Sequence, residues 1–529
     1  MKPFVILLCV LGSLTHAADT RPNILFIYAD DWGWGDLASH DHPHLKTPNL
    51  DRLIKEGTDF HQFTVGNPVC SPSRTAIVTG HYPARHGVHQ HFAGHAENVA
   101  RGMPDWLDPK APLLPRLMKQ AGYTTAHFGK WHLSGGGLDA PLPTEYGYDD
   151  AAVWTGPGRS VFEDTPIQAM TGDAHDQHAA SFLTTAATEH ALRFIRAANE
   201  KPFYLNLWIH ETHHLVSATD EDKKAYPDTA EPQRTYYSAI TRADKQIGRV
   251  LELLDELKIT DNTLVIFSSD NGPENSHAKP SEKFYHSVGT TGGLRGRKRS
   301  LYLGGVNVPF IVRWPGHVPA GRIDKTSILS GVDVFPTLLA ATGIPAPEGY
   351  TSDGLNVLPA FKGKPFTRPQ PIFWEWRGPH SQEADWPTHA IREGDHILLH
   401  DETFARVELY HVLNDRPQQQ NLAATEPDRV AAMKAKLDTW RATLPTPFQQ
   451  SPSGSRKDAN QPPPAKTNPK PAPDRSTAFK RWDKNNDRLL TLEEYTNGLA
   501  KKEDAPKRFK NFDQNSDGKL SPSEFVGTP

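Results

Sequence analysis

The sequence predicts an α/β fold in which a mostly parallel sheet lies between layers of helices. Three runs of strand length, at residues 23–29, 203–209 and 263–269, are almost wholly apolar, as expected for strands buried on both faces. Helical segments are predicted at 181–196 and 236–258, the second with a clear apolar stripe. Polar residues follow each strand directly, and open α/β sheets bind ligands at the carboxyl ends of their strands. A functional site is therefore expected at this edge.

The length of the chain restricts the number of domains, and its charge restricts the kinds of partner. At 529 residues the chain is too long for one ordinary core, so two or three domains are expected. Its 58 basic and 62 acidic residues give a net charge of -4, which does not favour a nucleic acid partner. An anionic ligand would need a local site.

The first 17 residues are predicted to be a secretory signal peptide. A basic N-terminus precedes an apolar run at 4–14 that is too short to span a bilayer, and cleavage is predicted after Ala17. The product is expected to be periplasmic or secreted, with no membrane span. Because Cys9 lies in the signal, Cys70 is the only cysteine of the mature chain. Such a leftover thiol is expected to be reactive or modified.

Oxygen-rich side chains follow two of the predicted strands. Asp30 and Asp31 come directly after the first strand, and Asp270 and Asn271 come directly after the third. The carboxyl ends of parallel strands share one edge of a sheet, so these four side chains are expected to meet. Four hard oxygen ligands suit calcium best, and magnesium or manganese less well. Either pair taken alone would be an ordinary turn.

Cys70 is expected at the N-terminus of a helix. Pro72 suits the first helical turn, and Ser71 and Ser73 could cap free amides. Such a helix end attracts anions and activates a thiol, and Arg74, one turn further on, projects to the same face. Cys70 is therefore a candidate reactive centre for an anionic substrate. A small buried hydrophobe at a helix start would show the same pattern.

Two more polar sets follow strands. After the strand predicted at 123–128, Lys130 and His132 would point the same way if the chain stays extended, so an ammonium and an imidazole could reach one site. The strand at 203–209 leads into residues 210–214, which contain three histidines and a glutamate. Their spacing is not that of a helical metalloprotease, which disfavours zinc there.

Together these motifs resemble the sulfatase family. Cys70, Pro72 and Arg74 match its C-x-P-x-R signature, and Lys130 and His132 lie in its Gly-Lys-Trp-His motif. The remaining motifs follow in the family's order over most of the chain. The resemblance implies an alkaline phosphatase-like fold with a small antiparallel C-terminal subdomain.

The resemblance also implies a mechanism. In that family a maturation enzyme oxidises the cysteine to formylglycine (3-oxoalanine), whose hydrate is the nucleophile, so Cys70 is expected to be the modified residue. The implied catalytic residues are Cys70, Arg74, Lys130, His132, His213 and Lys298. The implied ligands of one active-site Ca²⁺ are Asp30, Asp31, Cys70, Asp270 and Asn271.

Lys298 lies in the basic loop at 294–299, which on its own would be a solvated charge run. Arg297 and Arg299, beside it, depart from the small residues frequent in the family. The substrate is expected to be a sulfated small molecule or polysaccharide. Two alternatives stay open: a phosphonate or phosphate ester hydrolase of the same superfamily, and a noncatalytic calcium-dependent carbohydrate-binding protein with an unmodified Cys70.

The expected organisation is a catalytic domain at 18–372, a C-terminal subdomain at 373–449, a Pro-rich linker at 450–473 and a helical module at 474–529. The module contains two stretches that resemble the twelve-residue calcium loops of an EF-hand pair, and the first has Arg488 where glycine is preferred. The predicted loop residues are Asp483, Asn485, Asp487, Thr491 and Glu494, then Asp513, Asn515, Asp517, Lys519, Ser521 and Glu524.

Overall fold

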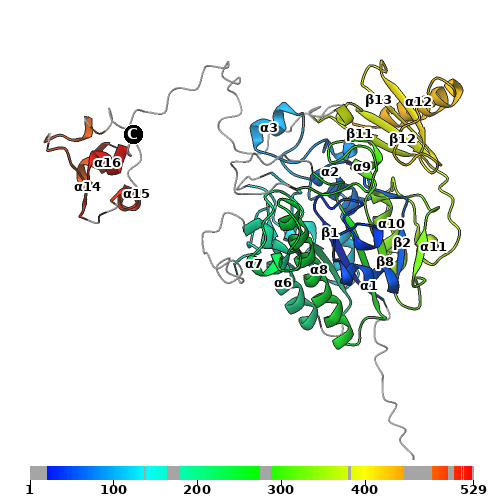
Figure 1. Ribbon diagram of the computed structural model, residues 1–529, viewed down its shortest axis with the longest axis horizontal. Coiled ribbons are helices and arrows are strands. Elements are labelled where there is room, and N and C mark those ends of the chain that lie inside the picture. The colour runs from blue at the N-terminus through cyan, green and yellow to red at the C-terminus, as the bar shows by residue number, and fades with distance from the viewer. Residues whose placement is uncertain are drawn as a thin grey trace, which may run out of the picture. The chain divides into compact units, whose positions relative to one another are not determined.

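Figure 1 shows the computed structural model of the chain. The residues it describes are 21–135, 139–163, 179–198, 201–274, 287–378, 383–445, 479, 481–485, 487–498, 505–513, 515 and 517–526. The predicted signal peptide and the predicted linker at 450–473 lie outside the described residues. The chain divides into two compact units, one up to residue 450 and one from residue 451.

An eight-stranded sheet forms the centre of the first unit, in the order β5-β4-β6-β1-β7-β8-β2-β9. The neighbouring strands from β5 to β7 are parallel. β8 is antiparallel to both β7 and β2, so the sheet is mixed but mostly parallel, as predicted. The strands in chain order are β1 Asn23–Ala29, β2 Thr58–Phe60, β4 Thr124–Lys130, β5 Asp150–Trp154, β6 Phe203–Trp208, β7 Thr263–Ser269, β8 Phe310–Arg313 and β9 Arg322–Asp324.

Helices cover both faces of this sheet. Alternate residues of β1 point into two different cores: Phe26 belongs to the one that contains α2, and Leu25 to the one that contains α6 and α8. Figure 1 shows α6 and α8 side by side. All seven residues of β1 are buried, which explains its apolar sequence. The helices are α1 Pro48–Glu56, α2 Cys70–Thr79, α3 His95–Ala100, α4 Leu114–Gln120, α6 Leu183–Ala197, α7 Asp220–Lys223, α8 Gln233–Glu256, α9 Leu303–Val306, α10 Val334–Thr342, α11 Leu358–Phe361 and α12 Pro427–Arg441.

A four-stranded antiparallel sheet follows, with α12 packed on it. Residues 389–393 and 396–400 form two strands that pair with each other. Gly394 lies between them with φ 54, a conformation that glycine adopts without strain, and this turn closes a hairpin. The strands are β11 Ile372–Glu375, β12 His389–Glu393, β13 His396–His400 and β14 Val407–His411.

The second unit is a small helical module with its own apolar core. Its two short strands pair antiparallel, with Leu490 opposite Leu520. The core residues are Phe479, Leu490, Tyr495, Ala505, Phe509, Leu520 and Phe525. The elements are β15 Leu490–Thr491, α14 Leu492–Gly498, α15 Ala505–Phe512, β16 Lys519–Leu520 and α16 Pro522–Val526.

None of the helices in the described parts of the chain combines the length and the apolar character that crossing a bilayer requires. The sheet has a more direct consequence for the site. β4, β6, β1 and β7 run in the same direction, so the residues that follow them leave the sheet at one edge. β4 and β6 also approach closely at Gly129, where a Cβ would lie 2.0 Å from the carbonyl oxygen of Trp208.

Candidate functional site

The ends of β1 and β7 bring the four predicted metal ligands together. Ala29 pairs with Ser269 in the parallel register, so Asp30 and Asp270 leave the sheet side by side. The amide of Asp31 donates to Asp270 Oδ1 at 3.1 Å, and Asn271 Nδ2 donates to Asp31 Oδ1 at 2.7 Å. All four side chains are fully buried.

Cys70 lies against this group of carboxylates. It is the first residue of α2 and is only 2 % exposed. Its Sγ and one carboxylate oxygen each of Asp30 and Asp31 all lie within 4.8 Å of one another. The helix N-terminus predicted from the sequence thus faces the strand ends that carry the acids.

Two expectations about this helix start were wrong. Ser71 and Ser73 do not cap the helix: Ser71 Oγ accepts from the amide of Phe92, and Ser73 Oγ bonds to Tyr28. The thiol is also not activated. Burial raises the pKa of Cys70 to about 11, against the opposing charges of two nearby lysines. An unmodified Cys70 would therefore be a protonated, weak nucleophile at neutral pH.

Arg74 holds the end of β7 in place. Its Nε and Nη2 both donate to Asp270 Oδ2, at 3.1 and 2.6 Å, and Nη2 lies 3.6 Å from Asp30 Oδ1. The guanidinium also lies over the ring of Trp208, 4.8 Å from its centroid. Burial of this charge would be costly without these partners.

Two lysines pair with the adjacent aspartates. Lys130 Nζ donates to Asp30 Oδ2 at 2.6 Å, and Lys298 Nζ donates to Asp31 Oδ2 at 2.7 Å. Burial alone would lower the pKa of both lysines, but the carboxylates outweigh it and raise both values. Both amines therefore stay charged.

Sequence reasoning missed Glu274 at this place. It lies 3.2 Å from Lys298 Nζ and also pairs with Arg299, so two of the four cations of the basic loop share one acid. The only feature of the sequence that pointed to Glu274 was its position four residues after Asp270.

The carboxylates compete for the available positive charge. Burial raises the pKa of Asp31 to about 7, Lys298 opposes the shift, and neighbouring acids add to it. Burial also acts on Asp30, but Lys130 and nearby histidines hold its pKa well below the usual range. Asp30 Oδ1 and Asn271 Oδ1 are buried without a hydrogen-bond partner. Two buried oxygens without hydrogen-bond partners, close to several carboxylates, fit a divalent cation with oxygen ligands.

His132 follows β4, but the chain there is not extended as the sequence had suggested. β4 ends at Lys130, and His132 has φ 51. Its Nε2 lies 3.1 Å from the carbonyl oxygen of Phe92. Burial, followed by the charge of Lys130, lowers the pKa of His132 well below its usual value, so the ring is neutral.

Two histidines follow β6 at the same edge. His213 Nε2 lies 3.9 Å from Asp31 Oδ2, whereas His210 contacts Asp30 directly through Nδ1. The two rings are stacked, with centroids 4.7 Å apart. His210, which was not among the implied catalytic residues, is therefore in contact with the carboxylates. Its place two residues beyond the end of β6, the parallel neighbour of β1, was the signal in the sequence for this contact.

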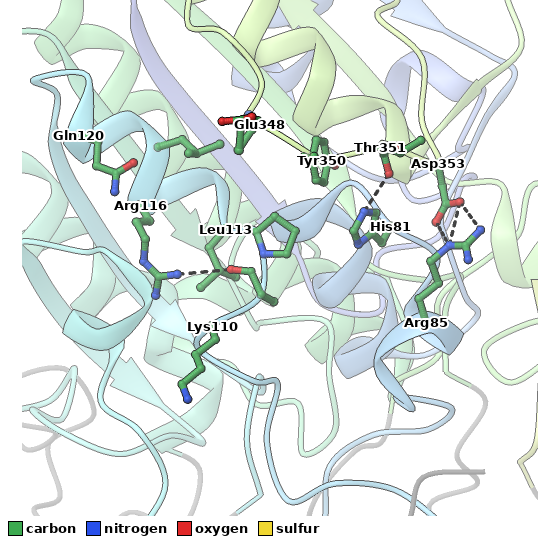
Figure 2. Close-up of a pocket in the computed structure, with 15 residues that line it drawn as sticks. His81, Arg85, Lys110, Leu113, Arg116, Gln120, Glu348, Tyr350, Thr351 and Asp353 are labelled. Carbon is green, nitrogen blue, oxygen red and sulfur yellow. Dashed lines mark hydrogen bonds and ion pairs between the residues drawn. The ribbon is translucent and has the colours of Figure 1, made fainter. Parts of the chain in front are cut away.

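Two cavities lie near segments that contact or follow α2. One of about 740 Å³ includes His132, Phe92 and Trp154 in its wall, and the amide of Phe92 donates to Ser71 in the first turn of α2. Figure 2 shows the other, in which His81 and Arg85 are directed towards Thr351 and Asp353. It begins just after the C-terminus of α2, and a ten-residue helix is about 15 Å long. The second cavity is therefore at the far end of the helix from Cys70.

Comparisons with known proteins indicate the family to which the chain belongs. Residues 22–344 match the family described as Sulfatase, and residues 296–443 match the one described as N-sulphoglucosamine sulphohydrolase, C-terminal. N-acetylgalactosamine-6-sulfatase of Homo sapiens is 36% identical over 397 residues, which cover 69% of this chain and 70% of that protein. Arylsulfatase G of Mus musculus is 30% identical over 380 residues, covering 65% and 69%. The crystal structure of Ps i-CgsB in complex with k-i-k-neocarrahexaose is similar with a TM-score of 0.67 and 27% identity, over 79% of this chain and 92% of that one.

Replacing Arg74 tests the charge balance of the cluster. We expect Arg74→Met to lower the free energy of unfolding by about 3–5 kcal/mol, because it leaves Asp270 buried without its partner. Thermal or urea unfolding of the full chain measures this. Arg196→Met is the matched control: Arg196 pairs with Glu256 at the surface, where ion pairs contribute little, and its unfolding midpoint should hardly move. Equal losses in the two variants would contradict the assignment.

Proposed function

Because the chain belongs to the sulfatase family, and is thus a sulfuric ester hydrolase, we propose that it removes sulfate from a sulfated sugar through a formylglycine made from Cys70. Sulfatases in general use formylglycine and a divalent cation. The observation that carries the proposal is the position of Cys70, whose sulfur lies beside the carboxylates of Asp30 and Asp31 at the start of a buried helix.

The chemistry requires a nucleophile that can release sulfate again. One hydroxyl of the aldehyde hydrate attacks sulfur, and the sugar oxygen leaves with a proton. The second hydroxyl then loses its proton, its electron pair re-forms the carbonyl, and the carbon–oxygen bond to sulfate breaks. A sulfated serine could not collapse in this way, which is why an aldehyde is suited to the task.

The proposed cation is Ca²⁺, held by Asp30, Asp31, Asp270 and Asn271, next to residue 70. When bound, it would supply the positive charge that polarises a sulfate oxygen. The two orphaned oxygens of Asp30 and Asn271 support this assignment. The proposed ligand set contains only oxygen from the protein's strand ends, which favours calcium over a softer metal.

The side chains of this chain have separable roles in the proposal. Arg74 and Lys130 stabilise the hydrate, and Lys130, held charged by Asp30, adds to the positive field. His132 is neutral and can accept the proton that the second hydroxyl loses. Lys298 stays cationic and, with His213, faces the leaving sugar oxygen.

The cavity beside His132 is the proposed place for the sugar. Its volume of about 740 Å³ lies within the range of ligand sites, about 300–1,000 Å³. Trp154 offers an apolar wall, and Ser134 and Ser160 offer hydroxyls. N-acetylgalactosamine-6-sulfatase is named for a sulfated sugar, and Ps i-CgsB was solved with an oligosaccharide. Both support a carbohydrate substrate for this chain.

We further propose an exported location and calcium binding by the C-terminal module. The location depends on the predicted signal peptide, and modification of Cys70 would require a maturation enzyme as partner. In the module, the amides of Arg488 and Gly518 donate to the first aspartate of their respective loops, each at 3.0 Å. This shared pattern supports two loops of the EF-hand kind. Arg488 has φ 64, which costs about 1–3 kcal/mol outside glycine, so the first loop should bind calcium less tightly.

The nucleophile can be tested on the protein from its own organism. Peptide mass spectrometry across Cys70 should find an aldehyde in place of the thiol. Cys70→Ala should lower kcat on any sulfate ester at least about 10³-fold, because loss of a covalent nucleophile is rarely compensated. An unmodified thiol together with unchanged turnover in Cys70→Ala would contradict the proposal. An unmodified thiol with no turnover of any sulfate ester would favour the noncatalytic carbohydrate-binding alternative.

The substrate class can be tested at Trp154. We expect Trp154→Ala to raise KM for a sulfated oligosaccharide about tenfold, the equivalent of about 1.4 kcal/mol of lost contact. A small aryl sulfate is the matched control, and its KM should stay the same. Aryl phosphate turnover by the wild type separates the remaining alternative: a rate above that of the aryl sulfate would indicate a phosphate ester hydrolase.

Calcium binding by the module can be tested by calorimetric titration of the full chain. Glu524→Gln should remove one tight calcium site, because Glu524 occupies the twelfth position of the complete loop. Glu494→Gln is the matched variant and should remove a weaker site. Calcium stoichiometry that is the same in the wild type and both variants would show that the module does not bind calcium.

A further inference from the structure

A second group of metal-binding side chains lies outside the catalytic cluster. His40 ends a short 3₁₀ helix, Ala38–His40, that follows β1; Asp59 lies in β2, and His61 follows β2. His40 Nε2 lies 2.8 Å from Asp59 Oδ2, and His61 Nε2 lies 3.1 Å from the same oxygen. The proposed sulfatase reaction uses none of the three residues.

The hydrogen bonds of His40 show that a positive charge is needed here. Its Nδ1 lies 2.7 Å from the carbonyl oxygen of Trp34, which can only accept, so Nδ1 carries a hydrogen. In a neutral ring Nε2 then presents a lone pair, yet it faces a carboxylate oxygen of Asp59. Two acceptors 2.8 Å apart require a proton or a metal cation between them.

Asp59 gives independent support. It is only 2 % exposed, and its second oxygen, Oδ1, is buried without a partner. A buried carboxylate oxygen without a hydrogen bond is costly unless a cation or water satisfies it. Because both histidines contact Oδ2, the lone Oδ1 shows that hydrogen bonds alone do not satisfy the buried Asp59.

The spacing of the three ligand atoms suits a tetrahedral ion. With metal–nitrogen and metal–oxygen distances of about 2.0–2.1 Å, neighbouring ligands of a tetrahedral zinc lie about 3.3 Å apart. The measured separations of 2.8 and 3.1 Å are within a few tenths of an ångström of this value, and all three atoms lie within 4.8 Å of one another. Two imidazoles and one carboxylate are a ligand set that zinc accepts.

The surroundings hold the rings in position. Metal-binding histidines commonly donate their other nitrogen to a carbonyl, as His40 does to Trp34. The Trp34 ring stacks on His40, with centroids 4.1 Å apart, and meets His61 edge-on at 4.9 Å. His40 is 2 % exposed and His61 is 18 % exposed, so an ion and a water ligand can reach the group from the His61 side.

We propose that His40, Asp59 and His61 bind a zinc ion that ties the segment after β1 to strand β2. The site is structural and distinct from the proposed calcium site, whose four ligands Asp30, Asp31, Asp270 and Asn271 all offer oxygen. The competing explanation is a group held together by a proton on His40, and the following experiment separates the two.

Zinc titration of the full, chelator-treated chain in excess calcium is the first test. Calcium occupies sites made of oxygen ligands and leaves a nitrogen-rich site free for zinc. We expect the wild type to bind zinc at this site and His61→Gln to bind it at least about tenfold more weakly. His317→Gln, which changes a histidine stacked on Trp314 elsewhere, is the matched control and should bind zinc like the wild type. Equal zinc affinity in the wild type and His61→Gln would overturn the proposal.

A second measurement does not depend on any variant. An anomalous difference map at the zinc edge, from crystals of the wild type grown with both metals, should show a peak between His40, Asp59 and His61. A map with zinc peaks only at the catalytic cluster, or with none, would show that a proton fills this group. Because this test uses the unaltered chain, it holds even if His61→Gln fails to fold.

Discussion

The site depends on the balance of buried charge at one edge of the sheet. Four acids, Asp30, Asp31, Asp270 and Glu274, are largely removed from water there, and each pairs with its own cation. The two lysines and two arginines come from three segments, and their four positive charges cancel those of the acids when all four acids are ionised. Buried charges without partners would be strongly destabilising. A divalent cation added to this neutral set would leave two positive charges, which is what an anionic substrate requires.

The parallel sheet makes this crowding possible. Strands β4, β6, β1 and β7 deliver Lys130, His210, Asp30 and Asp270 to the same edge, each from a strand buried on both faces. The two apolar cores pack on the two faces of the sheet. They hold the strand ends together against the mutual repulsion of the carboxylates there. Helix α2 enters from one of these cores and places Cys70 among the acids. The geometry of the site is thus a direct consequence of strand order.

Much of this could be predicted from local patterns. Apolar runs identify strands, and polar residues directly after them identify the edge where Asp30 and Asp270 meet. Contacts that depend on tertiary packing could not be predicted. Ser71 prefers the amide of Phe92, from a distant loop, over the helix end. His132 has φ 51, which is uncommon for a residue other than glycine, and its ring reaches the Phe92 carbonyl from there. Glu274 has a role only because the basic loop folds back over it.

The buried environment of Cys70 affects which chemical form of this side chain can react. Burial, the largest influence on its pKa, keeps the thiol protonated, while Lys130 and Lys298 would stabilise an anion at the same place. A hydrated aldehyde gains from these two lysines without having to ionise a buried sulfur. The side chain is 2 % exposed, and every residue of α2 is buried. In the folded chain Cys70 is thus closed to another enzyme, and the conversion that we propose would have to precede the packing of α2 against the sheet.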